Sequence, residues 1–173
     1  MSERYCSVNP HVTRSHTGVR NVLLSTDPQN TEYHVYYVTR CYATRHGSGP
    51  LPHDQGTDVM YPGIVDPNNV HNEFQGSIRY GILDLDELFK RINEDLEYFD
   101  TFNVPKQNVI KHLAVTCLDQ TNIVKFYHNS RYFELNVHDF MRYIIDYCTE
   151  DGYSGILFSH GPSSMDVTRI DLG

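Results

Sequence analysis

The chain has 173 residues, with 22 acidic against 14 basic side chains and a net charge of −8. This charge argues against a protein that binds nucleic acid or a membrane surface over a broad area. The length suits one domain spanning residues 1–173, and no apolar run is long enough to cross a membrane. Without a signal-peptide pattern, we expect a cytoplasmic protein.

The potentially reactive side chains match no familiar pattern. The four cysteines are Cys6, Cys41, Cys117 and Cys148. They form no C-x-x-C pair, and the last three lie in apolar surroundings, which predicts reduced core thiols. His46 and His53 have no zinc-site spacing, and no Walker-type phosphate loop occurs. We therefore expect no metal site made by this chain alone.

The first half of the chain predicts a short helix, a strand, a long loop and a helix. Residues 18–25 form the short helix, and residues 32–42, rich in β-branched and aromatic side chains, form a core strand. Residues 47–71 are a loop rich in glycine and proline. A helix begins at Asp84, with Glu87 three residues later as a capping box. Its apolar side chains recur at helical spacing, and its charged ones are expected to face water: Asp86, Lys90, Glu94 and Asp95.

The second half predicts a buried strand, a hairpin, a helix and two more strands. These are residues 111–118, 123–135 as an edge hairpin, 137–148 with Asn136 as the cap, 153–158 and 166–170. Strands that alternate with helices favour an α/β fold with a mostly parallel sheet and flanking helices.

The core strand ends in a loop that can contact a ligand. Gly47, Gly49 and the prolines that follow allow no regular structure, and Arg45 stands just before them. Small residues let backbone N–H groups approach a ligand, and an arginine donates a fork of hydrogen bonds to phosphate or carboxylate. The alternative is a solvent turn with ordinary surface arginines.

Two later strands also end in loops suited to binding. Asp119 follows residues 111–118, and a carboxylate there accepts the paired N–H groups of guanine, which adenine lacks. Ser159 and Gly161 follow residues 153–158 and could offer amides and a hydroxyl to the same base. The alternatives are a turn aspartate bonded to its own backbone and a tight strand-to-strand turn. In a parallel sheet the three loops would share one edge, where ligands bind.

Five segments, in order along the chain, resemble the C-terminal half of adenylosuccinate synthetase. They are P-H-V-T-R-S-H-T (10–17), R-C-Y-A-T-R-H-G-S-G-P-L-P (40–52), N-E-F-Q-G-S-I-R-Y-G-I-L-D (72–84), T-C-L-D (116–119) and F-S-H-G-P (158–162). The resemblance covers nearly the whole chain. It implies the C-terminal part of that fold and the ligation of aspartate to a purine nucleotide, driven by GTP.

The resemblance also assigns roles to individual residues. By similarity, Thr13 would hold the nucleotide's phosphate, Asp119 would read the guanine of GTP, and Ser159 and Gly161 would lie against that base. Arg79 is what remains of the arginine loop that grips the carboxylates of the aspartate substrate.

The sequence departs from the family in what it lacks. The family's N-terminal half, with its glycine-rich phosphate loop and its catalytic aspartate and histidine, has no counterpart here, and Cys117 replaces a lysine that packs on the base. The sequence therefore predicts no catalytic residue of its own.

Three functions remain open. One is a nucleotide-binding half-ligase for IMP or dGMP, as in the viral and archaeal branch of the family, which is completed by a second chain carrying the phosphate loop; Mg²⁺ is expected only with that chain. Another is a stand-alone purine nucleotide binder without catalysis. The third is an interaction or structural protein with a degenerate fold. The sequence also leaves open whether the chain associates with further copies of itself.

Overall fold

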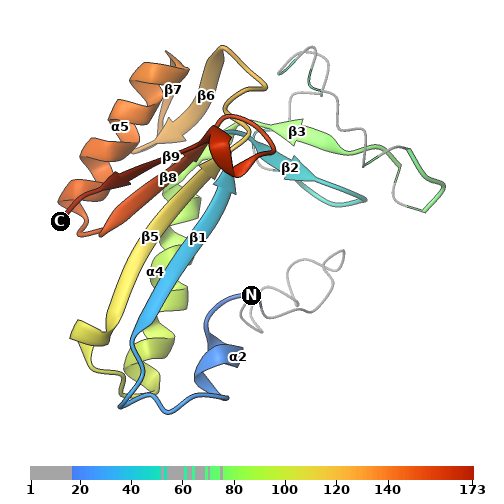
Figure 1. Cartoon of the computed structure of the whole chain (residues 1–173). Helices are drawn as coiled ribbons and strands as arrows, with labels where there is room; N and C mark the ends of the chain where they lie inside the picture. Colours follow the sequence, from blue (N-terminus) through green and yellow to red (C-terminus); the bar gives the residue numbers. More distant parts are fainter. Residues whose placement is uncertain are drawn as a thin grey trace.

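A four-stranded sheet forms the centre of the molecule, and its strands lie in the order β1, β5, β8, β9 (Figure 1). Their bounds are β1 Tyr33–Arg40, β5 Val109–Thr116, β8 Gly155–Ser159 and β9 Val167–Asp171. Strands β1, β5 and β8 are parallel, and β9 is antiparallel to β8. The predicted α/β fold with a mostly parallel sheet is therefore confirmed.

This computed structural model describes residues 17–51, 53, 61, 64, 69, 71–74 and 76–173. Thr13, predicted to bind phosphate, and Cys6 lie outside the described residues. Within them, Cys41, Cys117 and Cys148 are free thiols; Cys41 and Cys148 are buried, as expected of core thiols, whereas Cys117 is only half-buried. No helix in the described part of the chain has the length and apolar character needed to cross a bilayer.

Within the described residues, three α-helices accompany the sheet: α2 (Arg20–Leu23), α4 (Leu85–Thr101) and α5 (Val137–Glu150). Figure 1 shows α4 running behind β1 and β5, with α5 beside β8. The core between helices and sheet is almost entirely apolar and includes these fully buried side chains: Leu85, Leu113, Val115, Phe140, Ile144, Ile156 and Phe158. Its burial is the main stabilising contribution to this layer.

Both long helices begin at the predicted caps. The Asp84 carboxylate accepts the backbone N–H of Glu87 at 3.0 Å, and the Asn136 side-chain oxygen accepts that of Asp139 at 2.9 Å. The carboxylate of Glu87 accepts a hydrogen bond from Arg91, one helical turn later. A side-chain acceptor at the cap position binds a backbone N–H of the first helical turn that has no partner within the helix.

Two smaller sheets lie outside the central one. Strands β2 (Ala43–Arg45) and β3 (Arg79–Gly81) form an antiparallel pair. The predicted hairpin is β6 (Ile123–His128) with β7 (Arg131–Asn136), but it is not an edge of the central sheet. It forms a separate sheet with the short strand β4 (Leu83–Asp84).

The hairpin turn is held by a helix side chain that we expected to face water. Asn129 and Ser130, between β6 and β7, both have positive φ, as a tight two-residue hairpin turn requires. The Asp86 carboxylate accepts their backbone N–H groups at 2.8 and 2.9 Å. These bonds lower the pKa of Asp86 against the opposing effect of its burial.

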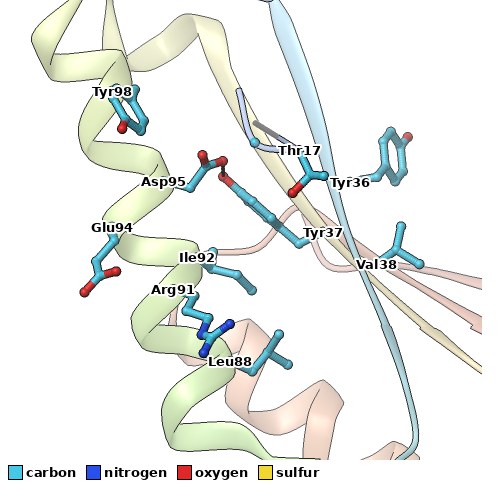
Figure 2. Close-up of a pocket in the computed structure, with 11 residues that line it drawn as sticks. Thr17, Tyr36, Tyr37, Val38, Leu88, Arg91, Ile92, Glu94, Asp95 and Tyr98 are labelled. Carbon is cyan, nitrogen blue, oxygen red and sulfur yellow. Dashed lines mark hydrogen bonds between the residues drawn. The ribbon is translucent and has the colours of Figure 1, made fainter. Parts of the chain in front are cut away.

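Asp95 is a second exception to the expected solvated face of α4. Its carboxylate accepts the backbone N–H of Val19, 3.2 Å from each oxygen, and the hydroxyl of Tyr37 at 3.0 Å. Figure 2 shows the Tyr37 ring crossing from β1 to this carboxylate. Burial and the nearby Asp95 charge raise the pKa of Tyr37, so that the phenol stays a donor. Asp95 thus ties the start of α2 and strand β1 to α4.

Replacing Asp95 with alanine should destabilise the fold. Asp95→Ala leaves the Val19 N–H and the Tyr37 hydroxyl without their acceptor, at a cost of about 1–3 kcal/mol in the free energy of unfolding. Urea unfolding followed by circular dichroism measures the change. Glu94→Ala, at the exposed neighbouring position, is the control and should have little effect; equal losses in both variants would contradict this role for Asp95.

The outer face of the central sheet carries a pair of histidines joined end to end. His34 Nδ1 and His112 Nε2 are 3.3 Å apart, the two rings are within 9° of parallel, and the Tyr36 ring stacks on His112 at 4.3 Å. A hydrogen bond between these two ring nitrogens requires that one of them carries a hydrogen and that the other is unprotonated and accepts it. The pKa of His112 is lowered first by burial, then by His34 and Arg169, while Asp171 opposes the shift.

Stability should fall in mild acid because of His112. Its pKa in the folded chain lies below the value of about 6.5 for an unfolded one, so its contribution is complete above that pH and is lost as the pH decreases. Urea unfolding at a series of pH values measures this slope, which His112→Gln should reduce. His138→Gln, exposed on α5, should leave it unchanged. An unaltered slope in His112→Gln would assign the acid sensitivity to other groups.

Candidate functional site

The carboxyl ends of β1, β5 and β8 meet at one edge of the central sheet, here called the rim and comprising residues 41–42, 117–122 and 159–163. The Cys41 N–H donates to the Thr116 carbonyl at 3.0 Å, and the Leu118 N–H donates to the Ser159 carbonyl at 3.1 Å. Parallel pairing thus continues past each strand end and brings the Asp119 and Ser159 loops together, as the sequence predicted. The third predicted loop, Gly47–Gly49, is not part of this edge, because the chain leaves the central sheet through β2, which pairs with β3.

Side chains also join the loops of the rim. The Tyr42 hydroxyl donates a short hydrogen bond to Gln120, and the Cys41 thiol donates to the Cys117 carbonyl at 3.2 Å. Cys117 has a φ of 65°, a left-handed conformation that is strained for a residue with a side chain. The backbone therefore turns sharply just before Asp119.

Burial keeps the thiol and the phenol at this edge uncharged. Desolvation raises the pKa of Cys41 to about 12, with further contributions from Cys117 and Asp119. Burial likewise raises the pKa of Tyr42. A thiol this basic is no nucleophile at neutral pH. Asp119 brings a fixed negative charge to the rim, and Arg40, the last residue of β1, brings a guanidinium that lies 5.9 Å from the centre of the Tyr42 ring.

Asp119 is exposed at the rim. Among the described residues, none donates a hydrogen bond to its carboxylate, unlike the turn aspartate Asp27, which accepts from Gln29 and Asn30. Both oxygens of Asp119 therefore retain their capacity to accept.

Ser159 and Gly161 lie in the turn that leads from β8 to β9. The Ser159 hydroxyl donates to the Gly161 carbonyl at 2.9 Å, and the His160 N–H donates to the Asp166 carbonyl at 2.9 Å. A Cβ at Gly161 would lie 2.5 Å from the Asp166 carboxylate, so a larger residue would have to displace this carboxylate from the Ser163 N–H that it accepts. This geometry matches the alternative interpretation, a strand-to-strand turn, while keeping the segment beside Asp119.

The other predicted binding residues form a separate cluster, which we call the arginine clamp: Arg45, Gly47, Gly49 and Arg79. Arg45 and Arg79 face each other across β2 and β3. Arg79 Nη2 donates to the carbonyls of Gly47 and Gly49 at 3.0 and 2.6 Å, and Arg45 Nε donates to the Ser48 carbonyl at 2.9 Å. The two guanidinium groups thus bind the backbone of residues 47–49, which we call the glycine loop. The sequence did not indicate this role.

Gly49 is required where Arg45 covers it. Its φ is 105°, and a Cβ there would lie 2.5 Å from Arg45 Nη2. The loop therefore depends on two glycines with positive φ, Gly47 and Gly49, for its conformation, and on two arginines for its hydrogen bonds.

Removing the Arg79 fork should loosen the glycine loop. Arg79→Ala deletes donors to two carbonyls, which should ease local opening by about 1–3 kcal/mol and speed amide exchange about ten-fold or more. Hydrogen–deuterium exchange on peptides that cover residues 46–51 measures this. Arg142→Ala, exposed on α5, is the matched control; unchanged exchange in Arg79→Ala would show that the clamp does not hold the loop.

Three cavities lie away from the predicted residues. One of about 430 Å³ lies between β1 and α4, one of about 460 Å³ between β1 and the α2 segment, and one of about 590 Å³ between α4, α5 and the β6–β7 turn. None of the three is lined by Asp119, Ser159 or Arg79. Across the described part of the chain, no three His, Cys, Asp or Glu side chains gather as a metal site would require.

No protein-family model matches the chain, and the comparison with curated proteins also finds no match. The resemblance to adenylosuccinate synthetase therefore rests on the sequence segments alone and remains a prediction.

Two features of the site escaped the sequence analysis. Tyr42 and Gln120 join the first two loops of the rim, and Asp95 anchors β1 from behind. The role of Asp95 could have been found in the sequence, because this residue lies at helical spacing with Leu88, Ile92 and Phe99, on the side of the helix where an apolar residue is expected. A charged residue in such a stripe predicts a buried partner.

Proposed function

We propose that this chain is the purine-nucleotide-binding, C-terminal half of a ligase similar to adenylosuccinate synthetase. The observation that supports it most is the rim, where three loops gather at the carboxyl ends of parallel strands, the usual ligand position in such sheets. The exposed Asp119 carboxylate has the right chemistry for guanine, since its two oxygens can accept the base's adjacent N–H groups.

The reaction inferred from the resemblance is the joining of aspartate to IMP or dGMP, driven by GTP or ATP. The sequence has no counterpart of the family's phosphate loop or of its catalytic aspartate and histidine, so the phosphate loop, Mg²⁺ and proton transfer are assigned to a second chain. The role of this chain is then to bind and select the purine nucleotide.

A stand-alone binder without catalysis is the second candidate. The arginine clamp favours it, because Arg79 Nη2 already donates to two loop carbonyls, so this part of the guanidinium serves the loop rather than a substrate carboxylate. Calorimetry with GTP, IMP, dGMP and ATP, followed by a ligase assay with aspartate and a chain that supplies the phosphate loop, separates the two. Binding without turnover favours the stand-alone binder, and no binding of any purine nucleotide refutes both.

Asp119→Asn should erode the preference for guanine. The amide replaces one acceptor oxygen with a donor, and losing a hydrogen bond to a charged group should lower the GTP-to-ATP affinity ratio about 10- to 100-fold. Calorimetry on both nucleotides measures the ratio. Asp146→Asn makes the same charge change on the exposed face of α5 and should not alter it. An unchanged ratio in Asp119→Asn would exclude Asp119 from the base site.

A further inference from the structure

Gln120 is held at the rim by its backbone and by one end of its side-chain amide. Its Oε1 accepts the short hydrogen bond from the Tyr42 hydroxyl. Its backbone N–H donates to the Cys117 carbonyl at 3.2 Å, which closes a turn over residues 117–120 that contains Asp119. These two contacts fix Gln120 next to Asp119, although both residues are exposed.

Tyr42 is a rigid anchor for this amide. The residue is 2% exposed, and its ring centre lies 5.5 Å from those of both Tyr61 and Tyr80. Burial raises the pKa of the Tyr42 phenol, so at neutral pH the hydroxyl keeps its proton and donates it. Because this donor binds the oxygen of the Gln120 amide, the NH₂ group of the amide is directed away from Tyr42.

The NH₂ group of Gln120 is an available donor at the rim. Among the described residues, none accepts a hydrogen bond from it, and none donates one to the Asp119 carboxylate. The Ser159 hydroxyl, which the sequence suggested as a donor to a base, already donates to the Gly161 carbonyl. Two consecutive side chains of the rim therefore offer a pair of acceptor oxygens and a separate donor.

A purine with a carbonyl at position 6 has the complementary groups along one edge. Guanine carries the N1–H and N2–H donors and, next to them, the O6 acceptor. We propose that the Gln120 NH₂ group donates to O6 of the purine base that Asp119 binds. This inference rests on the proposed function and narrows its substrate class to nucleotides of guanine and hypoxanthine. Adenine is disfavoured, because its 6-amino group is a donor and would face the donor of Gln120.

Gln120 and Asp119 read different atoms of the base. Asp119 accepts from positions 1 and 2, so its loss should affect guanine more than hypoxanthine, which has no 2-amino group. Gln120 reads position 6, which the two bases share, so its loss should affect both alike. Gln120 is then a specificity-determining residue, and Tyr42 is the positioning residue that orients it.

Calorimetry with GTP and 6-thioguanosine triphosphate tests the contact at position 6. The two nucleotides differ only in the replacement of O6 by sulfur, a weaker hydrogen-bond acceptor. The unmodified chain should bind GTP about three- to ten-fold more tightly, as expected for one hydrogen bond. Gln120→Met has a side chain of similar length without a donor and should bring this ratio close to one. Gln107→Met, at an exposed position just before β5, is the matched control and should keep it.

Tyr42→Phe tests the positioning role. The change retains the ring but removes the hydroxyl that orients the Gln120 amide, so the ratio of the two affinities should fall part of the way. When Gln120→Met is already present, Tyr42→Phe should not change the ratio further, whereas a purely structural effect of Tyr42 would not depend on Gln120. Circular dichroism establishes that each variant is folded.

The outcomes separate this inference from the proposed function. If the unmodified chain binds no purine nucleotide, the proposed function fails, and the Gln120 contact fails with it. If GTP binds but is not preferred over the thio analogue, or if the preference survives Gln120→Met, the Gln120 contact alone is refuted. A preference that is lost equally in Gln107→Met also refutes it.

Discussion

The parallel pairing of β5 with a strand on each side is the constraint on which the rest of the structure depends. Eight residues of β5 pair with β1, and four pair with β8. Residues 112–115 are buried, because strands flank β5 on both sides and the helices cover its inner face. Parallel strands deliver their carboxyl ends to one edge, so this pairing alone places Asp119 between the loops that follow β1 and β8.

The arginine clamp shows how one side chain can serve either structure or recognition. A guanidinium binds a phosphate, a carboxylate or a peptide carbonyl with the same forked donors, and residue type does not distinguish these uses. Arg45 and Arg79 are cross-strand partners in the β2–β3 pair, and both of their guanidinium groups bind the glycine loop that follows β2. Their contacts fix the glycine loop, whereas Asp119, which receives no described donor, retains the capacity to bind.

Patterns with a local physical cause were predictable from the sequence. Both long helices, their caps at Asp84 and Asn136, and all four strands of the central sheet follow from side-chain periodicity and turn residues. The separate position of the β6–β7 hairpin was not predictable, because it depends on pairing with β4, which is only two residues long. The anchoring roles of Asp86 and Asp95 depend on backbone N–H groups brought in by tertiary folding, which helical spacing alone does not contain.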